Sequence, residues 1–372
     1  MIAQQLQKKL GQREEQGNKR RLFHAAEGAD FFSNDYLGLA TYNVLAEPVA
    51  ATGKQFSCGA TGSRLLSGNS DTAEALETFL SVFHETEAAL LFNSGYDANL
   101  GLYASLADRH TTILYDELCH ASIIDGIRLS QAKNSFRFRH NDNEDLRRKL
   151  EKYTPHGPVI IAVESVYSME GDLAPLAETA LLAEQHNAAL IVDEAHATGV
   201  FGGGKGLVQQ LGLQDKIFAR VHTFGKAMGC HGAAVMSSHL VKEYLVNFAR
   251  SFIYTTALPE HSLAVIQAAY DRMLQQPAAI RQLHERIAYF RNKVMDTDRW
   301  KSSPSPIQSY IVGSNEKVRQ LNHALRDAGM NVCAIMHPTV PAGAERLRIC
   351  LHAFNTYEEI DRLTETIAAC NA

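Results

Sequence analysis

The chain has 372 residues, which is enough for two or three domains around a large core. Of these residues 45% are hydrophobic and 21% are charged, and the net charge of −5 argues against binding to nucleic acid or to an anionic membrane. Six scattered cysteines without a Cys-x-x-Cys pair indicate reduced thiols in a cytoplasmic protein, rather than a disulfide framework or a zinc site. We expect no signal peptide in residues 1–21, which lack an apolar core, and no membrane span of ~20 apolar residues.

The first part of the chain predicts two helices. Residues 3–20 are rich in Gln, Lys, Arg and Glu and predict an exposed helix. The i, i+3, i+4, i+7 spacing of an amphipathic helix recurs in residues 73–84, at Leu76, Phe79, Leu80 and Phe83. Asp71, three residues before Glu74, resembles a capping box at the start of this second helix.

Buried strands and helices then alternate. Apolar runs at residues 88–92, 111–115, 159–163 and 188–192 predict buried strands, and stretches such as 173–186 predict helices between them. This order predicts an α/β fold with a mostly parallel sheet covered on both faces. After about residue 275, a helix, strands at 307–312 and 346–350 and a terminal helix predict a smaller α+β domain. We therefore expect an N-terminal segment (1–43), a large domain (44–275) and a small C-terminal domain (276–372).

Polar residues follow the predicted strands where each strand ends. They are Ser94, Gly95 and Tyr96 after the first strand, Asp116 and His120 after the second, Glu164 to Ser168 after the third, and Asp193 after the fourth. In parallel sheets ligands bind beyond the carboxyl ends of the strands. These positions are therefore the candidates for a binding site.

Asp193 and Lys226 suggest the chemistry of that site. Asp193 ends a buried strand, and Lys226 follows 33 residues later in the sequence Thr-Phe-Gly-Lys. A carboxylate at a strand end can keep a pyridine nitrogen protonated, and a lysine on a later loop can hold an aldehyde as a Schiff base. The pair indicates pyridoxal 5′-phosphate (PLP), although a helix-capping acid and a surface lysine are the structural alternatives.

Other positions have a functional and a structural interpretation. His120 can stack on an aromatic cofactor or form a hydrogen bond at a helix start. The small residues around Gly95 can bind phosphate through backbone amides or form an ordinary turn. Arg346 and Arg348 lie on one face of a strand, where they can bind a carboxylate or face solvent.

Two competing functions are disfavoured by the sequence. Residues 193–196 spell Asp-Glu-Ala-His, as in nucleic-acid helicases, but the glycine-rich stretch 199–205 comes after them and is followed by Gly206 instead of Ser or Thr. The hydroxyl that would bind magnesium is therefore missing. Sixteen histidines occur without a metal-ligand spacing such as His-Glu-x-x-His, which argues against metal-dependent hydrolysis.

From about residue 31 to its end, the chain resembles the α-oxoamine synthases, PLP enzymes of fold type I (the aspartate-aminotransferase-like fold). The segments that carry the resemblance occur in one order: residues 33–38 (SNDYLG), 59–64 (GATGSR), 67–68 (SG), 120–122 (HAS), 165–172 (SVYSMEGD), 192–196 (VDEAH) and 223–226 (TFGK). The segment 22–30 is shorter than is usual in the family, which leaves acyl-chain recognition open. Arg64 could touch the acyl donor or brace its loop.

The resemblance implies a role for each matching residue near the cofactor ring. Lys226 would carry the cofactor aldehyde and later move the substrate proton. Asp193 would pair with the pyridinium nitrogen and His120 would stack on the ring. Ser168 and His196 would lie near the phenolic oxygen.

The resemblance also implies residues for the phosphate and the substrates. The amides of Gly95 and Tyr96 and the side chain of Thr223 would hold the phosphate. Thr255 and Thr256 would reach it from a second subunit, which implies a homodimer with shared active sites. The remaining two assignments concern the substrates: Arg348 would bind the amino-acid carboxylate, and Asn34 would line the acyl site.

Members of this family are acyltransferases that condense an amino acid with an acyl thioester and release CO₂. Residues 306–313 (PIQSYIVG) and 338–343 (PTVPAG) are similar to members that use L-alanine and a pimeloyl thioester in biotin biosynthesis. The thioester would be carried by coenzyme A or by an acyl carrier protein. Glycine with acetyl-CoA or succinyl-CoA, and serine with a long acyl-CoA, are the alternative substrate pairs.

Overall fold

The structure is a computed structural model that describes residues 1–22, 24–42, 44–51, 56–57, 59–294, 299–301 and 303–370. Cys58, one of the six cysteines, and Asn43, where the first predicted segment ends, lie outside the described residues. The chain divides into two compact units. The larger comprises Leu37–Ser168 and Leu173–Ile280, and the smaller comprises Met1–Tyr36, Met169–Asp172 and Arg281–Ala372. The predicted boundaries at residues 43 and 275 remain predictions.

A seven-stranded sheet in the order β2-β8-β7-β6-β5-β3-β4 forms the centre of the larger unit. Its strands are β2 (Ala88–Phe92), β3 (Thr112–Asp116), β4 (Asn134–Phe138), β5 (Val159–Glu164), β6 (Ala189–Asp193), β7 (Ala219–Thr223) and β8 (Ala233–Ser237). Neighbouring strands from β7 to β4 are parallel, and β8 is antiparallel to β2 and β7. The four predicted strands coincide with β2, β3, β5 and β6 to within one residue, and the mostly parallel sheet is confirmed.

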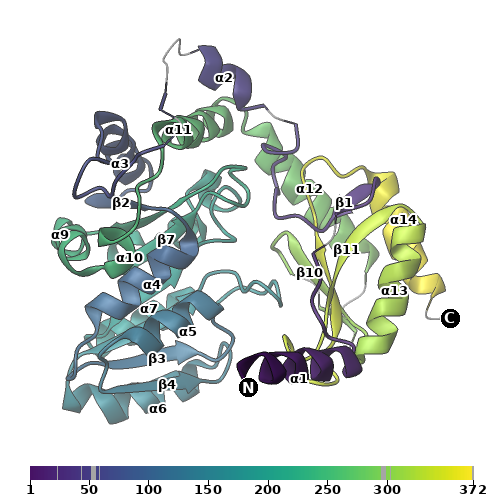
Figure 1. The fold of residues 1–372 in the computed structure, drawn as a ribbon, viewed down its shortest axis with the longest axis horizontal. Helices are drawn as coiled ribbons and strands as arrows, with labels where there is room; N and C mark the ends of the chain where they lie inside the picture. Colours follow the sequence, from purple (N-terminus) through teal and green to yellow (C-terminus); the bar gives the residue numbers. More distant parts are fainter. Residues whose placement is uncertain are drawn as a thin grey trace. The chain divides into compact units, whose positions relative to one another are not determined.

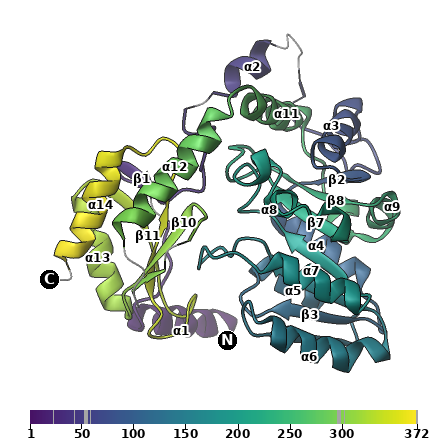
Figure 2. The same ribbon diagram turned by 180° about the vertical axis from the view of Figure 1, so that it is seen from behind.

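Helices cover both faces of this sheet. The helices of the larger unit are α2 (Ala46–Ala51), which packs on α11 and not on the sheet (Figure 1), α3 (Asp71–Phe83), α4 (Gly95–Leu106), α5 (Ala121–Leu129), α6 (Asn143–Tyr153), α7 (Leu176–Gln185), α8 (Leu207–Gln210), α9 (His239–Phe248), α10 (Arg250–Ile253) and α11 (Glu260–Gln275). Figure 1 shows α4 and α5 side by side over one face, and the view from behind in Figure 2 shows α7 on the other. Leu102 of α4 and Ile123 of α5 pack with Ile113 and Ile160 of the sheet in a buried core cluster. This packing fixes where α4 and α5 begin, at the edge of the sheet that carries the polar residues.

Three predicted helix termini were wrong, each because of a local interaction. The first helix, α1 (Ile2–Glu15), ends before residue 20 because Gly17 adopts a φ of 64° and the amide of Asn18 bonds back to the Arg13 carbonyl. The helix expected from residue 173 begins at Leu176, because Leu173 forms an isolated bridge with Val166.

The third correction concerns the start of α3. Its N-cap is Ser70, whose side chain accepts a hydrogen bond from the amide of Ala73, so Asp71 is not the capping residue. Glu74 bonds to Asn69 instead of closing a capping box with Asp71. Serine caps as well as aspartate, so the sequence pattern alone did not fix the register of the cap.

A five-stranded sheet in the order β1-β11-β12-β10-β9 forms the smaller unit. Its strands are β1 (Ala29–Phe31), β9 (Trp300–Lys301), β10 (Ile307–Ile311), β11 (Met330–Ile335) and β12 (Arg346–Cys350), and helices α13 (Asn315–Asp327) and α14 (Tyr357–Ala369) also belong to it. Helix α12 (Ala278–Lys293) carries the chain from the larger unit into the smaller one. The predicted α+β character of this part is confirmed. No helix in the described part of the chain is long and apolar enough to cross a membrane.

Candidate active site

A cavity of about 230 Å³ lies in the larger unit where β5, β6 and β7 end. Its described lining consists of Ser94, Gly95, Tyr96, Asn99, His120, Ser122, Glu164, Asp193, Ala195, Thr223, Gly225, Lys226, His231 and Gly232. Six of the predicted site residues belong to this set: Gly95, Tyr96, His120, Asp193, Thr223 and Lys226. The structure therefore brings them together at the carboxyl edge of the parallel strands, as expected for this kind of sheet.

Asp193 is buried at the end of β6, and its carboxylate is held from two sides. One oxygen accepts a 2.9 Å hydrogen bond from the amide of Ala195, and the other accepts a 2.7 Å bond from the side-chain amide of Asn99. Both donors are uncharged, so the carboxylate keeps its negative charge available for a cationic ligand in the cavity. Such a group can bind the protonated nitrogen of a heteroaromatic ring.

Lys226 lies three residues after β7, and its side chain is half-buried. Its Nζ is 2.9 Å from Nε2 of His196, which places the predicted lysine and the predicted histidine in direct contact. His196 itself is buried and lies outside the described lining of the cavity. A primary amine at this position can attack an aldehyde or exchange a proton with a bound substrate.

Helix α4 points its N-terminus at the cavity. Ser94 caps the helix by accepting a hydrogen bond from the amide of Asp97, and Gly95 and Tyr96 are the first helical residues. The first amides of a helix have no partner within the helix and favour an anion. A Cβ atom on Gly95 would lie 2.3 Å from Cγ2 of Thr223, so glycine is required for this close approach. The arrangement can hold a phosphate group.

His120 begins α5, and its ring is open to the cavity. Burial of the surrounding site lowers the pKa of His120, and the neighbouring Lys226 lowers it further, while Asp193 and Asp125 raise it. The net direction favours the neutral imidazole. The ring of Tyr96 meets it edge-on, with 6.5 Å between the ring centroids.

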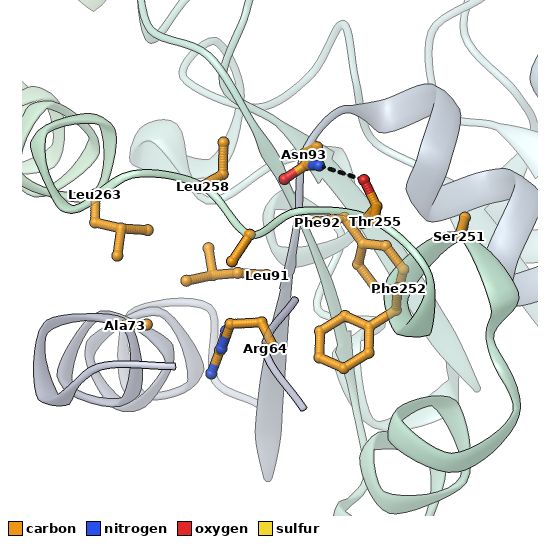
Figure 3. A pocket seen from close by; sticks show the side chains of 11 residues that line it. Arg64, Ala73, Leu91, Phe92, Asn93, Ser251, Phe252, Thr255, Leu258 and Leu263 are labelled. Atoms are coloured by element: carbon orange, nitrogen blue, oxygen red, sulfur yellow. Dashed lines mark hydrogen bonds between the residues drawn. The ribbon is translucent and has the colours of Figure 1, made fainter. Parts of the chain in front are cut away.

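Neither Thr255 nor Thr256 belongs to the described lining of this cavity, and Thr255 instead lines a second and much smaller pocket (Figure 3). The side-chain amide of Asn93 donates to Thr255 Oγ1 at 3.0 Å and to the Thr256 carbonyl at 2.8 Å. Asn93 directly precedes the N-cap of α4, so one side chain links the phosphate-binding loop to the threonine segment. Arg64 lines the same small pocket and pairs with Glu77 at 2.8 Å, so here it braces its loop.

Arg348 and Asn34 lie together in the smaller unit. Arg348 is buried on β12, and its guanidinium donates to Asn34 Oδ1 at 3.0 Å and to the sulfur of Cys350 at 3.0 Å. The hydroxyl of Tyr36 also donates to Asn34 Oδ1. Arg346, on the same face of the strand, instead pairs with Glu170 at 3.1 Å. The two arginines that looked equivalent in the sequence thus have different partners.

Sequence reasoning missed several residues of the cavity. Asn99 lies on α4 one turn after Gly95, and its contact with Asp193 joins residues far apart in the sequence. Ser122 was part of a noted segment but received no role, although it bonds to both His120 and Asn99. Ser168 lies half-buried in the turn after β5, outside the described lining of the cavity. The described residues contain no group of three or more His, Cys, Asp or Glu side chains that could hold a metal ion.

A family model described as aminotransferase class I and II matches residues 27–367. The chain belongs to this family. Among curated relatives, it is 43% identical to an 8-amino-7-oxononanoate synthase from Emericella nidulans, over 98% of this chain and 94% of the relative. It is 39% identical to the enzyme of the same name from Lysinibacillus sphaericus, over 95% of this chain and 94% of that protein.

Solved structures show the same architecture. The 8-amino-7-oxononanoate synthase of Francisella tularensis superposes with a TM-score of 0.77 at 29% identity, covering 92% of this chain and 97% of that one. Serine palmitoyltransferase from S. paucimobilis, solved with a PLP–myriocin aldimine, gives a TM-score of 0.89 at 27% identity, covering 98% and 96%. The predicted fold type I and the resemblance to the α-oxoamine synthases are confirmed.

Proposed function

We propose that this chain is a PLP-dependent acyltransferase that condenses L-alanine with a pimeloyl thioester to give 8-amino-7-oxononanoate, CO₂ and a free thiol, in biotin biosynthesis. The observation that carries this function is the cavity in which Lys226 and Asp193 face a common space. It occurs in a chain that is 43% and 39% identical, over nearly its whole length, to two curated enzymes named for making this product.

The groups around the cavity fit PLP in three respects. Asp193 offers a carboxylate that is already oriented by Ala195 and Asn99. The N-terminus of α4 offers backbone amides beside Gly95, where a side chain would collide with Thr223. Lys226 offers a primary amine for the aldehyde. When bound, PLP supplies an electron sink for the electron pair left behind when a bond to the substrate Cα breaks.

The residues of the chain supply binding and proton transfer. Lys226 accepts the Cα proton of alanine at Nζ, and His196 lies against that nitrogen. The Cα electron pair then forms a bond to the thioester carbonyl carbon, the carbon–sulfur bond breaks, and the thiolate leaves and takes up a proton. Loss of CO₂ and return of a proton to Cα complete the product. With PLP bound, Asp193 would hold a proton on the ring nitrogen, and His120 would pack against the ring.

The remaining site residues are assigned on the family resemblance. Arg348 binds the amino-acid carboxylate, for which a guanidinium offers two parallel donors. Asn34 serves the acyl donor, and Ser168 serves the phenolic oxygen of PLP. Thr255 and Thr256 help to bind the phosphate of the PLP held by a second subunit. Asn93 holds the two threonines in place through its side-chain amide. Because these threonines serve a second subunit, the enzyme is a homodimer. We assign it to the cytoplasm, and coenzyme A or an acyl carrier protein carries its thioester substrate.

The visible absorption spectrum of the purified protein tests this function. PLP bound through a lysine absorbs visible light, and the band should shift at the lowest concentration with L-alanine when alanine, glycine and L-serine are titrated separately. A shift at the lowest concentration with serine or glycine would assign the chain to a sibling reaction. The absence of any band after addition of PLP would refute the proposal.

A matched pair of lysine variants sharpens the test. Lys226→Ala should lose the lysine-bound band and turnover, because the amine is the group that bonds to the aldehyde. Lys205→Ala should keep both, because Lys205 pairs with Glu85 outside the described lining of the cavity. A Lys226→Ala protein with the turnover of the unmodified enzyme would contradict the assignment of the base.

A further inference from the structure

A chain of hydrogen bonds behind the cavity joins His120 to Asp193. The side-chain amide nitrogen of Asn99 donates to Asp193 Oδ2 at 2.7 Å and to Ser122 Oγ at 3.0 Å. Ser122 Oγ lies 2.8 Å from Nδ1 of His120. Asn99 and Ser122 are almost completely buried, with 2% and 1% of their surfaces exposed. Four side chains from α4, α5 and β6 are therefore connected without water.

The residues in this chain of hydrogen bonds determine which group donates and which accepts at each step. An ionised carboxylate only accepts, so the amide nitrogen of Asn99 must face Asp193, and its second hydrogen points to Ser122 Oγ. The Ser122 oxygen accepts that hydrogen, which leaves its own hydrogen to donate to His120 Nδ1. The backbone amide of Ser122 also donates to Nδ1, at 3.2 Å. Two donors thus converge on one ring nitrogen, which must carry a lone pair.

We propose that Asn99 and Ser122 are positioning residues that keep His120 in the neutral tautomer with its proton on Nε2. They also hold the ring at a fixed position relative to the Asp193 carboxylate. This inference rests on the proposed function, in which His120 covers the cofactor ring. Asp193 keeps that ring cationic, so a protonated His120 stacked on it would place two cations face to face. A neutral imidazole avoids this repulsion.

Charged groups around His120 act in opposite directions. Asp193 of β6 and Asp125 of the same helix favour the imidazolium, and Lys226 across the cavity disfavours it. Tyr96 of α4 meets the ring edge-on, and Glu164 and His231 also line the cavity. The carboxylates alone would favour the imidazolium, which carries a proton on Nε2 and also on Nδ1. The hydrogen-bond chain from Asn99 opposes this by presenting a donor to that nitrogen.

Nitrogen NMR of histidine-labelled protein tests the proposal directly. The signals of His120 can be found among the sixteen histidines by their loss in His120→Asn. In the PLP-loaded enzyme we expect the shifts of a neutral ring protonated at Nε2 at neutral pH. Signals of a ring protonated at Nδ1, or at both nitrogens, would overturn the proposal.

Two variants and one control separate positioning from general packing. Ser122→Ala removes the hydroxyl donor and keeps the backbone amide donor, so the pKa of His120 should rise while the neutral ring stays protonated at Nε2. Asn99→Ala removes a donor to a carboxylate and should weaken PLP binding roughly tenfold. Ser81→Ala removes another buried hydroxyl, which donates to the Thr78 carbonyl, and should leave His120 unchanged.

The outcomes distinguish this inference from the proposed function. If the pKa of His120 is the same in Ser122→Ala as in the unmodified protein, the positioning role is refuted even when PLP binds normally. If PLP does not bind to Lys226 at all, the proposed function fails. The ring protonation of the protein alone, measured before PLP is added, still decides whether the hydrogen bonds set the tautomer. Thermal unfolding of each variant verifies that it is folded.

Discussion

Glu194, the neighbour of Asp193, gives a quantitative prediction about stability and pH. It is fully buried after β6, and one carboxylate oxygen accepts a hydrogen bond from the amide of Val208 at 3.2 Å. A Cβ atom on Gly206 would collide with its other oxygen, so only glycine fits beside it. Burial raises the pKa of Glu194 to about 7, although the buried Arg220 guanidinium lowers it in part. The folded protein therefore binds this proton more tightly than the unfolded chain does.

The sign and size of the effect follow from proton linkage. The pKa of Glu194 is 4.5 in the reference state and about 7 when folded, so the unfolded chain releases the proton first as the pH rises. The free energy of unfolding should consequently fall across this window, by about 2.5 kcal/mol between about pH 5 and about pH 8.5. Below the pKa of the unfolded chain, the Glu194 carboxyl is neutral in both states, so its ionisation no longer lowers the free energy of unfolding.

Glu194→Gln isolates this effect. Glutamine keeps an oxygen for the Val208 amide but cannot ionise. The free energy of unfolding of the variant, relative to that of the unmodified protein, should therefore rise by about 2.5 kcal/mol from about pH 5 to about pH 8.5. Urea unfolding of both proteins across this range measures the difference. Buried histidines such as His84, whose pKa burial lowers to about 3, titrate in both proteins and cancel. A difference that stays constant with pH would refute the reasoning.

Three further substitutions test separate parts of the structure. Gly95→Ala should weaken PLP binding at least about tenfold in an absorbance titration, because the new methyl collides with Thr223; unchanged affinity would argue against phosphate binding there. Arg348→Ala should raise the KM for the amino acid roughly 30-fold or more with little change in PLP affinity, whereas Arg346→Ala should not; equal loss of both affinities would indicate misfolding. Ser70→Ala should lower the free energy of unfolding by about 1 kcal/mol in urea, because it removes the cap of α3; no change would mean that the cap lies elsewhere.

Local patterns in the sequence carried much of the fold. Apolar runs of five residues located β2, β3, β5 and β6 to within one residue, because strands buried on both faces need such runs. Strands such as β4 and β8 were not predicted. β4 has exposed side chains at two of its five positions and half-buried ones at two more, and β8 follows the lysine loop after a short glycine-containing turn. Pairing with β3 defines β4, and pairing with β2 and β7 defines β8, better than their own sequences do.

The sequence by itself determined which residue types meet at the site. Asp193 follows a buried strand and Lys226 follows the end of another, and parallel strands end at one edge, so the approach of these two residues could be predicted. Which of the two arginines of β12 would bind Asn34 and which would pair with Glu170 could not be predicted from their alternation. The alternation fixes the face of the strand and not the neighbours beyond it.

Only the tertiary structure decided the roles of Asn99 and Ser122. Asparagine inside a helix and serine near a helix start are common, so neither pattern indicates a site. Their importance comes from distances of 2.7–3.0 Å that arise when α4 and α5 pack over β6 and bring remote residues together. Hydrogen-bond partners depend on the packing of whole elements, whereas strand and helix patterns depend on neighbours along the chain. The sequence therefore determined the fold and the chemistry of the cavity, and the packing determined how its groups are oriented.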